Sequence, residues 1–380
     1  MKIAVIGSGL MGRAAVYDLA RAEGVEKVGL YDFDDDLAGE IAQKYGNNVT
    51  EAAKIDAGDE DAVTRELKKY DACISAVTYR FNPGLTRAAI ATNTHFFDLG
   101  GNNDVVAEQF AMSKLAENAG VLAIPDCGLA PGMVSVLAAD GVSKLDRIRA
   151  LKIRVGGLPQ NPHPPLNYQM VFSSEGLINE YWEPVVILEK GQPKTVEPMS
   201  DIEELEFDGI GKLEAFYTSG GTSTLPETFR GKIDFLDYKT IRYPGHCAIF
   251  RPMLEIGLAS RHEVKVDGVM IRPRRVFKKV LEKNLSFNEP DLVLVRVTLE
   301  GDKEGKQKKI VYEIIDRQDE RTGLTAMMRM TSFPVAIIAW MACSGKITKR
   351  GVVPQELAVD PGFFIEQLKM RQIALKVTEE

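Results

Sequence analysis

The chain has 380 residues, of which 45% are hydrophobic and 27% charged, and its formal net charge at pH 7 is −7. This length and composition are typical of a globular protein with two domains, and the negative charge argues against a nucleic-acid-binding surface. The four cysteines form no CxxC pair, so neither a disulfide framework nor a metal site is predicted. The longest apolar run, Phe333–Cys343, is too short to span a bilayer. An apolar strand begins at residue 2 and leaves no room for a signal peptide, so we expect a cytoplasmic protein without membrane contact.

A glycine-rich turn follows the first apolar run. Residues 2–6 lead into Gly7-x-Gly9-x-x-Gly12, and Arg13–Ala22 then has the composition of a helix. In such a strand–turn–helix unit the first glycine makes the turn and the second lets the backbone approach a pyrophosphate. The third lets the helix lie close to the strand. Because a helix N-terminus also favours phosphates, we predict a dinucleotide-binding site here.

The acids after the second apolar run indicate which dinucleotide binds. Asp32 ends the run Val28–Tyr31, twenty positions after the last glycine of the motif, and no Lys or Arg follows before Lys44. A carboxylate accepts a hydrogen bond from a free ribose 2′-OH, whereas the 2′-phosphate of NADP needs a cation. We therefore predict NAD, with Asp32 on the ribose. Asp34–Asp36 suit the first turn of the next helix, where the helix dipole favours acids.

Strand and helix signals then alternate as far as Pro131. The expected elements are helix 37–45, a short run ending at residue 56, helix 60–69, strand 72–77, helix 82–91, strand 95–99, helix 105–119 and strand 121–125. This alternation predicts an α/β fold, a doubly wound parallel sheet of the Rossmann type. We assign residues 1–131 to a Rossmann NAD-binding domain.

Beyond Pro131 the pattern becomes rich in strands and hairpins. Expected strands are 150–155, 185–188, 264–266, 292–299 and 309–315, with turns at Asp267-Gly268 and Gly301-Asp302. They predict a second, α+β domain over residues 132–324, with a largely antiparallel sheet, for substrate binding and oligomerisation. Apolar helices at 326–344 and 363–374 place residues 325–380 as C-terminal helices that pack back on the Rossmann domain. Ligands of parallel sheets bind beyond the carboxyl ends of the strands, so we expect the substrate between the two domains.

Polar residues directly follow several expected strands. Asp98-Leu-Gly-Gly101 and Asp126–Gly132 each place an acid after an apolar strand, with glycines behind it. Both acids are candidate ligands, and the alternative for Asp126 is a plain Asx-turn. The segment Ala76-Val77-Thr78 ends the fourth expected strand and is expected to line the nicotinamide side of the cofactor.

One arginine in the second half is a candidate carboxylate clamp. Arg242 lies within Lys239–His246, and a guanidinium can hold a carboxylate by two parallel hydrogen bonds. The alternative is a surface cation beside a turn. Tyr243 and His246 are candidate proton carriers. No two histidines have metal-ligand spacing, so we predict no metal.

The motifs of the whole chain together resemble the saccharopine dehydrogenase-like family. Beside the glycine motif and the two acidic loops, the likeness is carried by more specific segments of the second half: Val155–Pro159, Pro165–Tyr168, Phe172–Gly176, Ala215–Leu225 and Tyr238–Tyr243. Within the family, the chain is most similar to the branch of lysine 6-dehydrogenases, NAD-dependent enzymes that oxidise the ε-carbon of L-lysine. The family's reductases use NADPH and carry basic residues after the second strand, where this chain has acids.

The resemblance implies roles for individual residues. It places Asp126 and the Thr240–Arg242 segment on the substrate, residues 98–100 and 125 beside the cofactor, and Ser173 or Ser174 near the cofactor from the second domain. Our expected cofactor ligands are Gly7, Ser8, Gly9, Leu10, Met11, Gly12, Asp32, Phe33, Asp56, Ala57, Ala76, Val77, Thr78, Leu99, Gly100, Pro125 and Ser174. Our expected substrate ligands are Asp98, Asp126, Thr240 and Arg242. Our expected catalytic residues are Asp126, Tyr243 and His246.

The implied reaction is oxidative deamination of the ε-amino group of L-lysine. It gives the 6-semialdehyde, which cyclises to piperideine-6-carboxylate, together with NADH and ammonia. The implied assembly is a homo-oligomer, with a small amino acid as the substrate. Two alternatives remain open: a saccharopine or carboxynorspermidine-type reductase, which would require a second cation beside Arg242, and a non-catalytic NAD-binding sensor.

Overall fold

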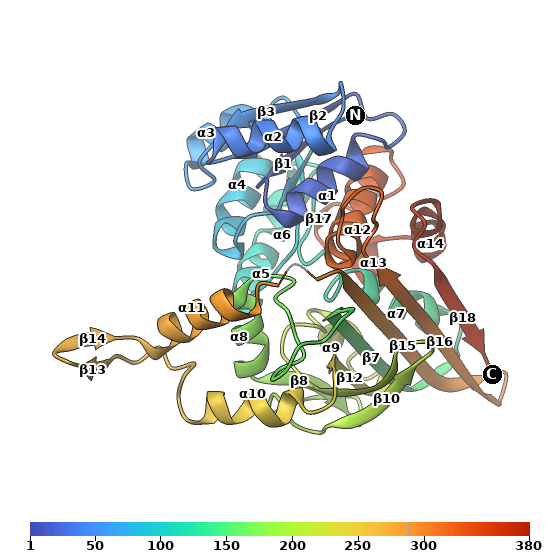
Figure 1. Ribbon diagram of the computed structural model, residues 1–380. Helices are drawn as coiled ribbons and strands as arrows, with labels where there is room; N and C mark the ends of the chain where they lie inside the picture. Colours follow the sequence, from blue (N-terminus) through green and yellow to red (C-terminus); the bar gives the residue numbers. More distant parts are fainter. Residues whose placement is uncertain (288) are drawn as a thin grey trace. The chain divides into compact units, whose positions relative to one another are not determined.

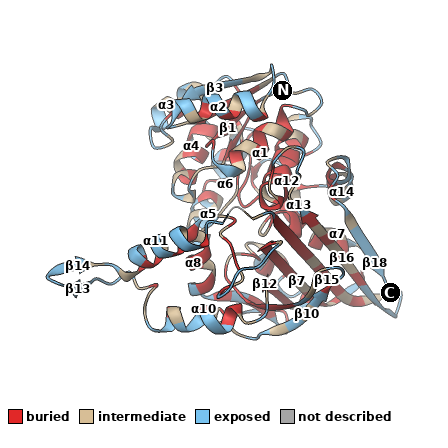
Figure 2. Ribbon diagram, viewed as in Figure 1, coloured by how far each residue is buried: buried red, intermediate tan, exposed pale blue. Residues whose placement is uncertain are grey.

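The computed structural model describes residues 1–287 and 289–380, which form two compact units (Figure 1). Unit 1 comprises Met1–Ser143 and Met328–Leu375, and unit 2 comprises Lys144–Met327 and Lys376–Glu380. Each unit has its own sheet and its own buried core, so each is described by itself (Figure 2).

Unit 1 is built on a seven-stranded parallel sheet in the order β17-β6-β5-β4-β1-β2-β3. Its strands are β1 (Lys2–Ile6), β2 (Lys27–Asp32), β3 (Thr50–Lys54), β4 (Ala72–Ser75), β5 (His95–Asp98), β6 (Leu122–Ile124) and β17 (Gly351–Val352). Most positions in the central strands are apolar and buried, as expected of parallel strands covered on both faces. The predicted Rossmann-type sheet is confirmed. Strand order reverses between β1 and β4, which is where such sheets bind ligands.

Four helices of unit 1 begin at a side-chain cap, supplied by Asp34, Asp59, Asn102 or Asp360. The helices of this unit are α1 (Leu10–Leu19), α2 (Asp35–Tyr45), α3 (Glu60–Leu67), the 3₁₀ turn η1 (Tyr79–Phe81), α4 (Asn82–Thr92), α5 (Asn103–Ala111), α6 (Ser113–Asn118), α7 (Met133–Ser143), α12 (Ala326–Cys343), α13 (Gln355–Ala358) and α14 (Pro361–Met370). Asp34 caps α2 by accepting a hydrogen bond from Leu37 N, which confirms the helix-start interpretation of Asp34–Asp36. The helix expected at 105–119 is two helices, α5 and α6, that meet at Met112.

The C-terminal residues of unit 1 pair with its sheet and form hydrogen bonds with α1 and the segment after it. β17 pairs with β6 and extends the sheet by one strand that the sequence did not predict. Trp340 Nε1 donates to the Glu23 carbonyl at 2.8 Å, and Arg371 forms two hydrogen bonds with Asp18 at 2.6 and 2.9 Å. α12 is, within the described residues, the one helix long and apolar enough to cross a membrane. Of its apolar window, 83% is buried inside the protein, as in the core helix of a soluble protein.

Unit 2 contains a nine-stranded sheet. Its main path is β10-β11-β12-β7-β15-β16-β18, and the hairpin β8–β9 joins through β12. The strands are β7 (Arg147–Pro159), β8 (Val185–Glu189), β9 (Gln192–Val196), β10 (Glu203–Phe207), β11 (Gly211–Tyr217), β12 (Ile233–Arg242), β15 (Asp291–Lys303), β16 (Lys306–Arg317) and β18 (Leu375–Glu379). β12 and β7 pair in parallel, whereas the other pairs with a described register are antiparallel. The predicted largely antiparallel sheet is therefore confirmed.

The helices of unit 2, except the short α9 (Leu225–Thr228), pack around an aromatic-rich core. They are α8 (Ser174–Trp182), α9, α10 (His246–Glu255) and α11 (Pro273–Leu285). A separate hairpin, β13 (Val264–Val266) and β14 (Val269–Ile271), turns at Asp267-Gly268 as predicted, and its apolar side chains are largely exposed (Figures 1 and 2).

The predicted turn at Gly301-Asp302 is wrong. Both residues lie inside β15, and the turn to β16 falls at Glu304-Gly305, where both φ angles are positive. Gly301 instead marks a β-bulge against β7. A Cβ on Gly301 would lie 2.1 Å from the Arg147 carbonyl oxygen, so a glycine is required there for close strand approach.

Candidate functional site

The turn between β1 and α1 has the geometry that the glycine motif predicts. Gly7 has φ +107°, and a Cβ there would lie 2.7 Å from the Ala76 carbonyl oxygen. A Cβ on Gly12 would lie 1.8 Å from the Gly7 carbonyl oxygen, so only glycine lets α1 lie this close. A Cβ on Gly9 would meet no atom within 4 Å. Gly9 therefore leaves open the space into which a pyrophosphate would enter.

The N-terminus of α1 also suits an anion. Gly9 is the N-cap, no side chain caps the helix, and the first turn carries no acid. The first N–H groups of a helix need partners, and the positive end of the dipole favours a phosphate. Leu10 is half-exposed at this end, whereas the Met11 carbonyl accepts a hydrogen bond from Ser332. These residues fit a dinucleotide.

Asp32 lies at the end of β2 and is held by the glycine turn. Its Oδ2 accepts from the Ser8 N–H at 2.6 Å and from the Ser8 hydroxyl at 2.7 Å, and its Oδ1 accepts from Asp34 N at 3.0 Å. Partial burial raises the pKa of Asp32, but the hydrogen bonds from Asp34 and Ser8 outweigh this and hold the pKa below its ordinary value. The carboxylate is therefore charged at neutral pH and is positioned to accept from a ribose hydroxyl.

A pocket of about 360 Å³ lies beside Asp32. Its lining includes four of the expected cofactor ligands besides Asp32: Phe33, Asp56, Ala57 and Val77. Ile6, Ile55, Arg80 and Phe81 complete it. The size and partly apolar lining suit the adenosine end of a dinucleotide. Thr78 is exposed and precedes η1.

Two cations near this pocket were not anticipated from the sequence. Arg80 lines it from η1, and the Lys54 ammonium lies 5.2 Å from the centre of the Phe33 ring. Lys54 is paired with Asp32 across β2 and β3. Neither cation belongs to the segment after Asp32: the parallel pairing of β2 with β3 brings Lys54 near the pocket, and the turn after β4 brings Arg80.

Asp98 and Asp126 meet at the carboxyl ends of β5 and β6. Asp98 is fully buried and accepts from Gly100 N at 2.7 Å, from Asp126 N at 3.2 Å and from the Gln109 amide at 2.7 Å. Burial raises the pKa of Asp98. Its two oxygens are directed at these protein groups, which suits a residue that fixes the loop better than a substrate ligand.

The loop beside Asp126 is tightly packed. Asp126 has φ +61° and is 3% exposed, and a Cβ on Gly100 would lie 1.6 Å from its Oδ1. The neighbouring candidates Leu99 and Pro125 are half-buried and buried, respectively. The structure therefore brings five of the predicted site residues together at one edge of the parallel sheet of unit 1: Asp98, Leu99, Gly100, Pro125 and Asp126.

In unit 2, Arg242 is buried at the end of β12, with only 2% of its surface exposed. Its Nε donates to the Tyr181 hydroxyl at 2.7 Å and its Nη1 donates to the Ile241 carbonyl at 2.8 Å. The guanidinium carbon lies 4.6 Å from the centre of the Tyr168 ring. The alternative of a surface cation beside a turn is therefore wrong, because β12 and the aromatic core enclose the side chain.

His246 supports this arginine through Tyr181. Its Nδ1 lies 2.9 Å from the Leu166 carbonyl, which can only accept, so Nδ1 carries the proton. Its Nε2 then accepts from the Tyr181 hydroxyl at 3.2 Å. Burial and the neighbouring Arg242 lower the pKa of His246 to about 3. Both ring nitrogens are engaged, so the ring suits a positioning residue and not a proton carrier.

The other two candidates on this strand and its turn differ in surroundings. The Thr240 hydroxyl lies on the same side of β12 as Arg242 and is 2.6 Å from the Thr218 hydroxyl. The Tyr243 hydroxyl donates to the Pro159 carbonyl at 2.9 Å, and its ring packs on the cluster around Ile241. Since Ile241 and Arg242 point to opposite faces of β12, the structure does not bring Tyr243 to the guanidinium. Ser174 opens α8, and its hydroxyl donates to Glu282 at 2.6 Å.

The sequence analysis missed Glu180, an acid near Arg242. Burial raises the pKa of Glu180 to about 7, although Arg242 lowers it. Glu180 lies three residues after the buried Leu177, on a helix that also buries Ile178 and Tyr181. An acid on the apolar face of an amphipathic helix was the signal that could have revealed it.

Arg242 differs from the other buried cations of unit 2. Arg154 pairs with Asp237 and Glu203, Lys239 pairs with Asp201 and Glu203, and Arg274 pairs with Glu175. Within the described residues, Arg242 forms no ion pair at N···O separations up to 4.0 Å. A buried charge without a counter-ion is costly, so a site of this kind favours an anionic ligand.

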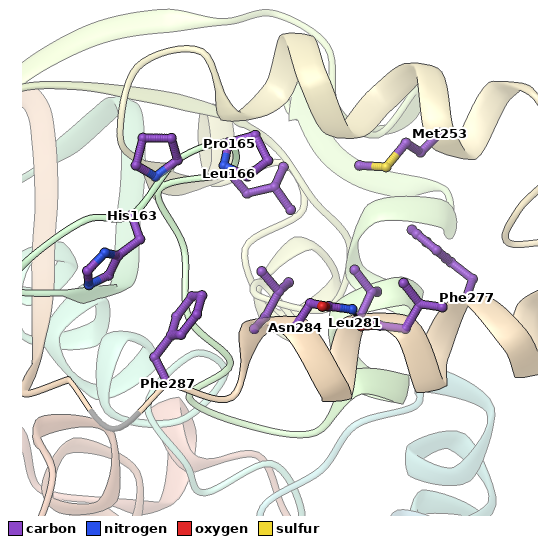
Figure 3. Close-up of a pocket in the computed structure, with 11 residues that line it drawn as sticks. His163, Pro165, Leu166, Met253, Phe277, Leu281, Asn284 and Phe287 are labelled. Carbon is purple, nitrogen blue, oxygen red and sulfur yellow. Dashed lines mark hydrogen bonds between the residues drawn. The ribbon is translucent and has the colours of Figure 1, made fainter.

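Unit 2 also has an apolar pocket of about 250 Å³. Figure 3 shows carbon-rich side chains around it, among them Leu166, Met253, Phe277 and Leu281. His163 and Asn284 are the polar side chains of its lining. The pocket lacks the charged groups that would bind an amino acid. Across residues 1–287 and 289–380, no three His, Cys, Asp or Glu side chains gather as a metal-ligand set.

Comparison with protein families matches both halves of the chain. The model of the saccharopine dehydrogenase NADP binding domain matches residues 3–124, and that of the saccharopine dehydrogenase C-terminal domain matches residues 128–373. The chain belongs to the saccharopine dehydrogenase family. Unit 1 therefore contains a pyridine-nucleotide-binding domain, and the protein is an oxidoreductase.

Individual members of the saccharopine dehydrogenase family match at low identity. Carboxynorspermidine synthase of Vibrio alginolyticus is 24% identical over 349 residues, which cover 84% of this chain and 80% of that protein. Saccharopine dehydrogenase [NADP(+), L-glutamate-forming] of Pyricularia oryzae is 24% identical over 286 residues, covering 72% of this chain and 62% of that protein. The mitochondrial alpha-aminoadipic semialdehyde synthase of rat is 23% identical, and the match covers only 28% of it.

A solved family structure has the same fold. The apo saccharopine dehydrogenase (L-Glu forming) of Saccharomyces cerevisiae superposes with a TM-score of 0.81 over 100% of this chain and 99% of that one, at 18% identity.

Proposed function

We propose that the protein catalyses the NAD-dependent oxidative deamination of the ε-amino group of L-lysine. The products would be NADH, ammonia and the 6-semialdehyde, which cyclises to piperideine-6-carboxylate. The observation that carries the proposal is Arg242, a buried guanidinium without an ion pair, in a family of oxidoreductases. Its free N–H groups suit the α-carboxylate of an amino acid.

The residues of each unit would have distinct tasks. In unit 1, Gly9 and the N-terminus of α1 would hold the pyrophosphate, and Asp32 would accept from the adenosine ribose. The nucleotide, when bound, supplies the hydride acceptor. In unit 2, Tyr181 and His246 would keep the Arg242 fork in one orientation for the substrate carboxylate.

NAD is proposed over NADP because the Asp32 carboxylate is charged and held toward the ribose position. A 2′-phosphate there would be repelled. Arg80 and Lys54 act in the opposite direction, and the exposed acids at the start of α2 add to the negative charge. We also propose a cytoplasmic location and, from the resemblance alone, a homo-oligomer.

A saccharopine or carboxynorspermidine-type reductase is the second candidate, and the family relatives favour it. Joining two substrates with two carboxylates would require a further cation near Arg242. The other buried cations described in unit 2 are ion-paired, and the neighbour of Arg242 is the acid Glu180. This difference supports lysine deamination.

Lysine labelled with 15N only at the ε position tests the proposal. Purified protein with NAD should release 15N-ammonia and form NADH and the cyclic imine, identified by mass. Unlabelled ammonia, or no ammonia at any pH, would refute the proposal. NADPH-dependent condensation of an amine with an aldehyde would instead establish the reductase. The rate of deamination should rise toward alkaline pH, because the ε-ammonium, with an ordinary pKa of roughly 10, must lose a proton first.

A further inference from the structure

We propose that Glu180 and Arg242 together bind the zwitterionic head of the substrate. Arg242 would hold the α-carboxylate, and the Glu180 carboxylate would accept from the α-ammonium. The inference deepens the proposed function and rests on it, since it takes L-lysine as the ligand. It adds a requirement for a free α-ammonium, which Arg242 alone does not impose.

Two neighbouring elements hold the pair. Glu180 and Tyr181 are adjacent on α8, and the Tyr181 hydroxyl accepts the hydrogen bond from Arg242 Nε at 2.7 Å. The Ser219 N–H donates to the Glu180 carbonyl at 2.9 Å, and the Ser219 hydroxyl donates to the Asn179 carbonyl at 3.3 Å. The end of α8 is thereby tied to the segment that follows β11. The acid and the guanidinium are thus held by contacts that do not involve each other.

The two charges are close enough to interact but are not paired. Arg242 affects the pKa of Glu180, yet no nitrogen of Arg242 lies within 4.0 Å of a Glu180 oxygen. The Glu180 carboxylate also makes no hydrogen bond with the rest of the chain as the structure describes it. An α-amino acid carries its carboxylate and its ammonium on one carbon. Such a head can contact both side chains at once and satisfy both.

Three tyrosine hydroxyls are near enough to the acid to interact with its charge. Glu180 interacts electrostatically with the hydroxyls of Tyr168, Tyr181 and Tyr238, which come from three different segments. Aromatic faces attract an ammonium, and they exclude the water that would otherwise solvate the carboxylate. A bound ammonium restores a partner for the carboxylate and lowers its pKa from about 7 in the free protein.

Glu180 is better placed for the α-ammonium than for the reacting ε-amine. The ε-nitrogen of lysine is separated from the α-carbon by four methylene groups. With the α-carboxylate on Arg242, the nitrogen nearest to a side chain beside Arg242 is the α-ammonium. Glu180 is therefore assigned to recognition and not to removal of the ε-proton.

Titration calorimetry without nucleotide tests the inference, with two ligands and three variants. The ligands are L-lysine and 6-aminohexanoate, which is lysine without its α-amino group. Glu180→Gln should weaken L-lysine binding by about 10- to 100-fold, the effect of losing a charged hydrogen bond, and leave 6-aminohexanoate within about twofold. Glu180→Asp should restore part of the L-lysine affinity. The control Glu255→Gln, an exposed acid on α10, should change neither affinity.

The affinity of the unmodified protein for L-lysine should also rise between pH 6 and pH 8, and that of Glu180→Gln should not. The charged or titratable groups near Glu180 are Arg242, Tyr168, Tyr181, Tyr238, His246 and Glu214. Of these, the pKa of His246 is about 3 and those of the three tyrosines are raised above the ordinary value, so they do not titrate in this window. The exposed control variant should retain the pH dependence.

Equal losses for both ligands in Glu180→Gln, or no loss for either, would overturn the inference, as would failure of the unmodified protein to bind L-lysine. Binding is measured without turnover, so the two proposals fail separately. If L-lysine binds with this Glu180 dependence but releases no 15N-ammonia, the proposed function fails and the inference stands. If 15N-ammonia is released but L-lysine binding does not depend on Glu180, the proposed function stands and the inference fails.

Discussion

Arg242 is the residue on which amino-acid recognition depends. Arg242→Lys keeps the positive charge but loses the planar fork and the Nε donor to Tyr181. We expect kcat/KM for L-lysine to fall by an amount equivalent to about 2–3 kcal/mol, while the NAD dissociation constant stays unchanged. Steady-state kinetics and nucleotide titration measure both. Arg251→Lys, at an exposed arginine of α10, is the matched control. Loss of NAD binding or unfolding in Arg242→Lys would show a structural role instead.

Glu180 also predicts a pH-dependent effect on stability. Its pKa in the folded protein, about 7, is raised from an ordinary value of 4.5, so the folded state binds this proton more tightly than the unfolded state. The contribution of Glu180 to stability is then greatest below pH 4.5, declines as pH rises to about 7, and stays low above that. Glu180→Gln should match the unmodified protein in Tm at pH 4.5 and exceed it at pH 8. A difference in Tm that does not change with pH would contradict this.

Asp32 and Phe33 should determine the choice of nucleotide. Asp32→Ser combined with Phe33→Arg removes the charged acceptor and adds a cation beside Arg80 and Lys54. The ratio of kcat/KM for NADP to that for NAD should rise at least about tenfold, which corresponds to about 1.4 kcal/mol. Asp35→Ser, in the first turn of α2, should change the ratio far less. An unchanged ratio in the double variant would refute the assignment of Asp32 as the ligand of the ribose.

The chemistry of single residues could be predicted from the sequence only where their partners are local. The glycine turn is such a case, because the motif encodes its own geometry within Gly7–Gly12. Glu180 is the opposite case. Its significance comes from Arg242 and Tyr168, which only the folded chain brings near it. The burial that lowers the pKa of His246 is likewise produced by the fold and not by the neighbours of His246 in sequence.

Among the elements, the loop after β5 offers a sharp test of packing. Gly100 and Gly120 have nearly the same φ, +70° and +68°, but a Cβ would meet Asp126 Oδ1 at 1.6 Å in the first and no atom within 4 Å in the second. Gly120→Ala should destabilise by about 1–2 kcal/mol, from the left-handed backbone alone. Gly100→Ala should destabilise the protein by about 1–3 kcal/mol more than Gly120→Ala does, because the Asp126 side chain must move.

Thermal unfolding of the two variants side by side measures the difference. Gly100→Ala should also lose activity, since the side chain displaced is a candidate substrate ligand. Equal Tm values would show that the loop relaxes without strain and that the close contact is not required.

Element types were predictable where hydrophobic periodicity decides them, and boundaries where a cap does. The strands of unit 1 other than β17, and the helix capped by Asp34, were expected. β12 was not, because it is buried on both faces but includes polar residues such as Thr240 and Arg242, so it lacks the continuous apolar run that marks a buried strand. The turn assigned to Gly301-Asp302 failed because a glycine at a β-bulge and a glycine in a turn look alike in sequence.

For the whole chain, the parallel or antiparallel class of each sheet could be predicted from the sequence. The packing of the C-terminal residues on unit 1 could be predicted only in part. Apolar helices near the end were expected to pack on the first domain. β17 has two residues, too few for any periodicity to be recognised. The Arg371–Asp18 pair joins positions 353 residues apart. Such contacts depend on tertiary packing, and no local pattern specifies them.

The division into two units also leads to a prediction about energetics. The nucleotide candidates Gly9 and Asp32 belong to unit 1, and Arg242 and Glu180 belong to unit 2, so the two sets share no residue. Changes at sites without shared partners are usually additive to within about 0.5 kcal/mol. Combining Asp32→Ser with Arg242→Lys should therefore lower kcat/KM for L-lysine by the product of the two single effects, within about twofold. Nucleotide-free lysine binding should be unaffected by Asp32→Ser, and NAD binding by Arg242→Lys. A coupling energy above about 1 kcal/mol, from the four rate constants, would show that the two halves are not independent recognition sites.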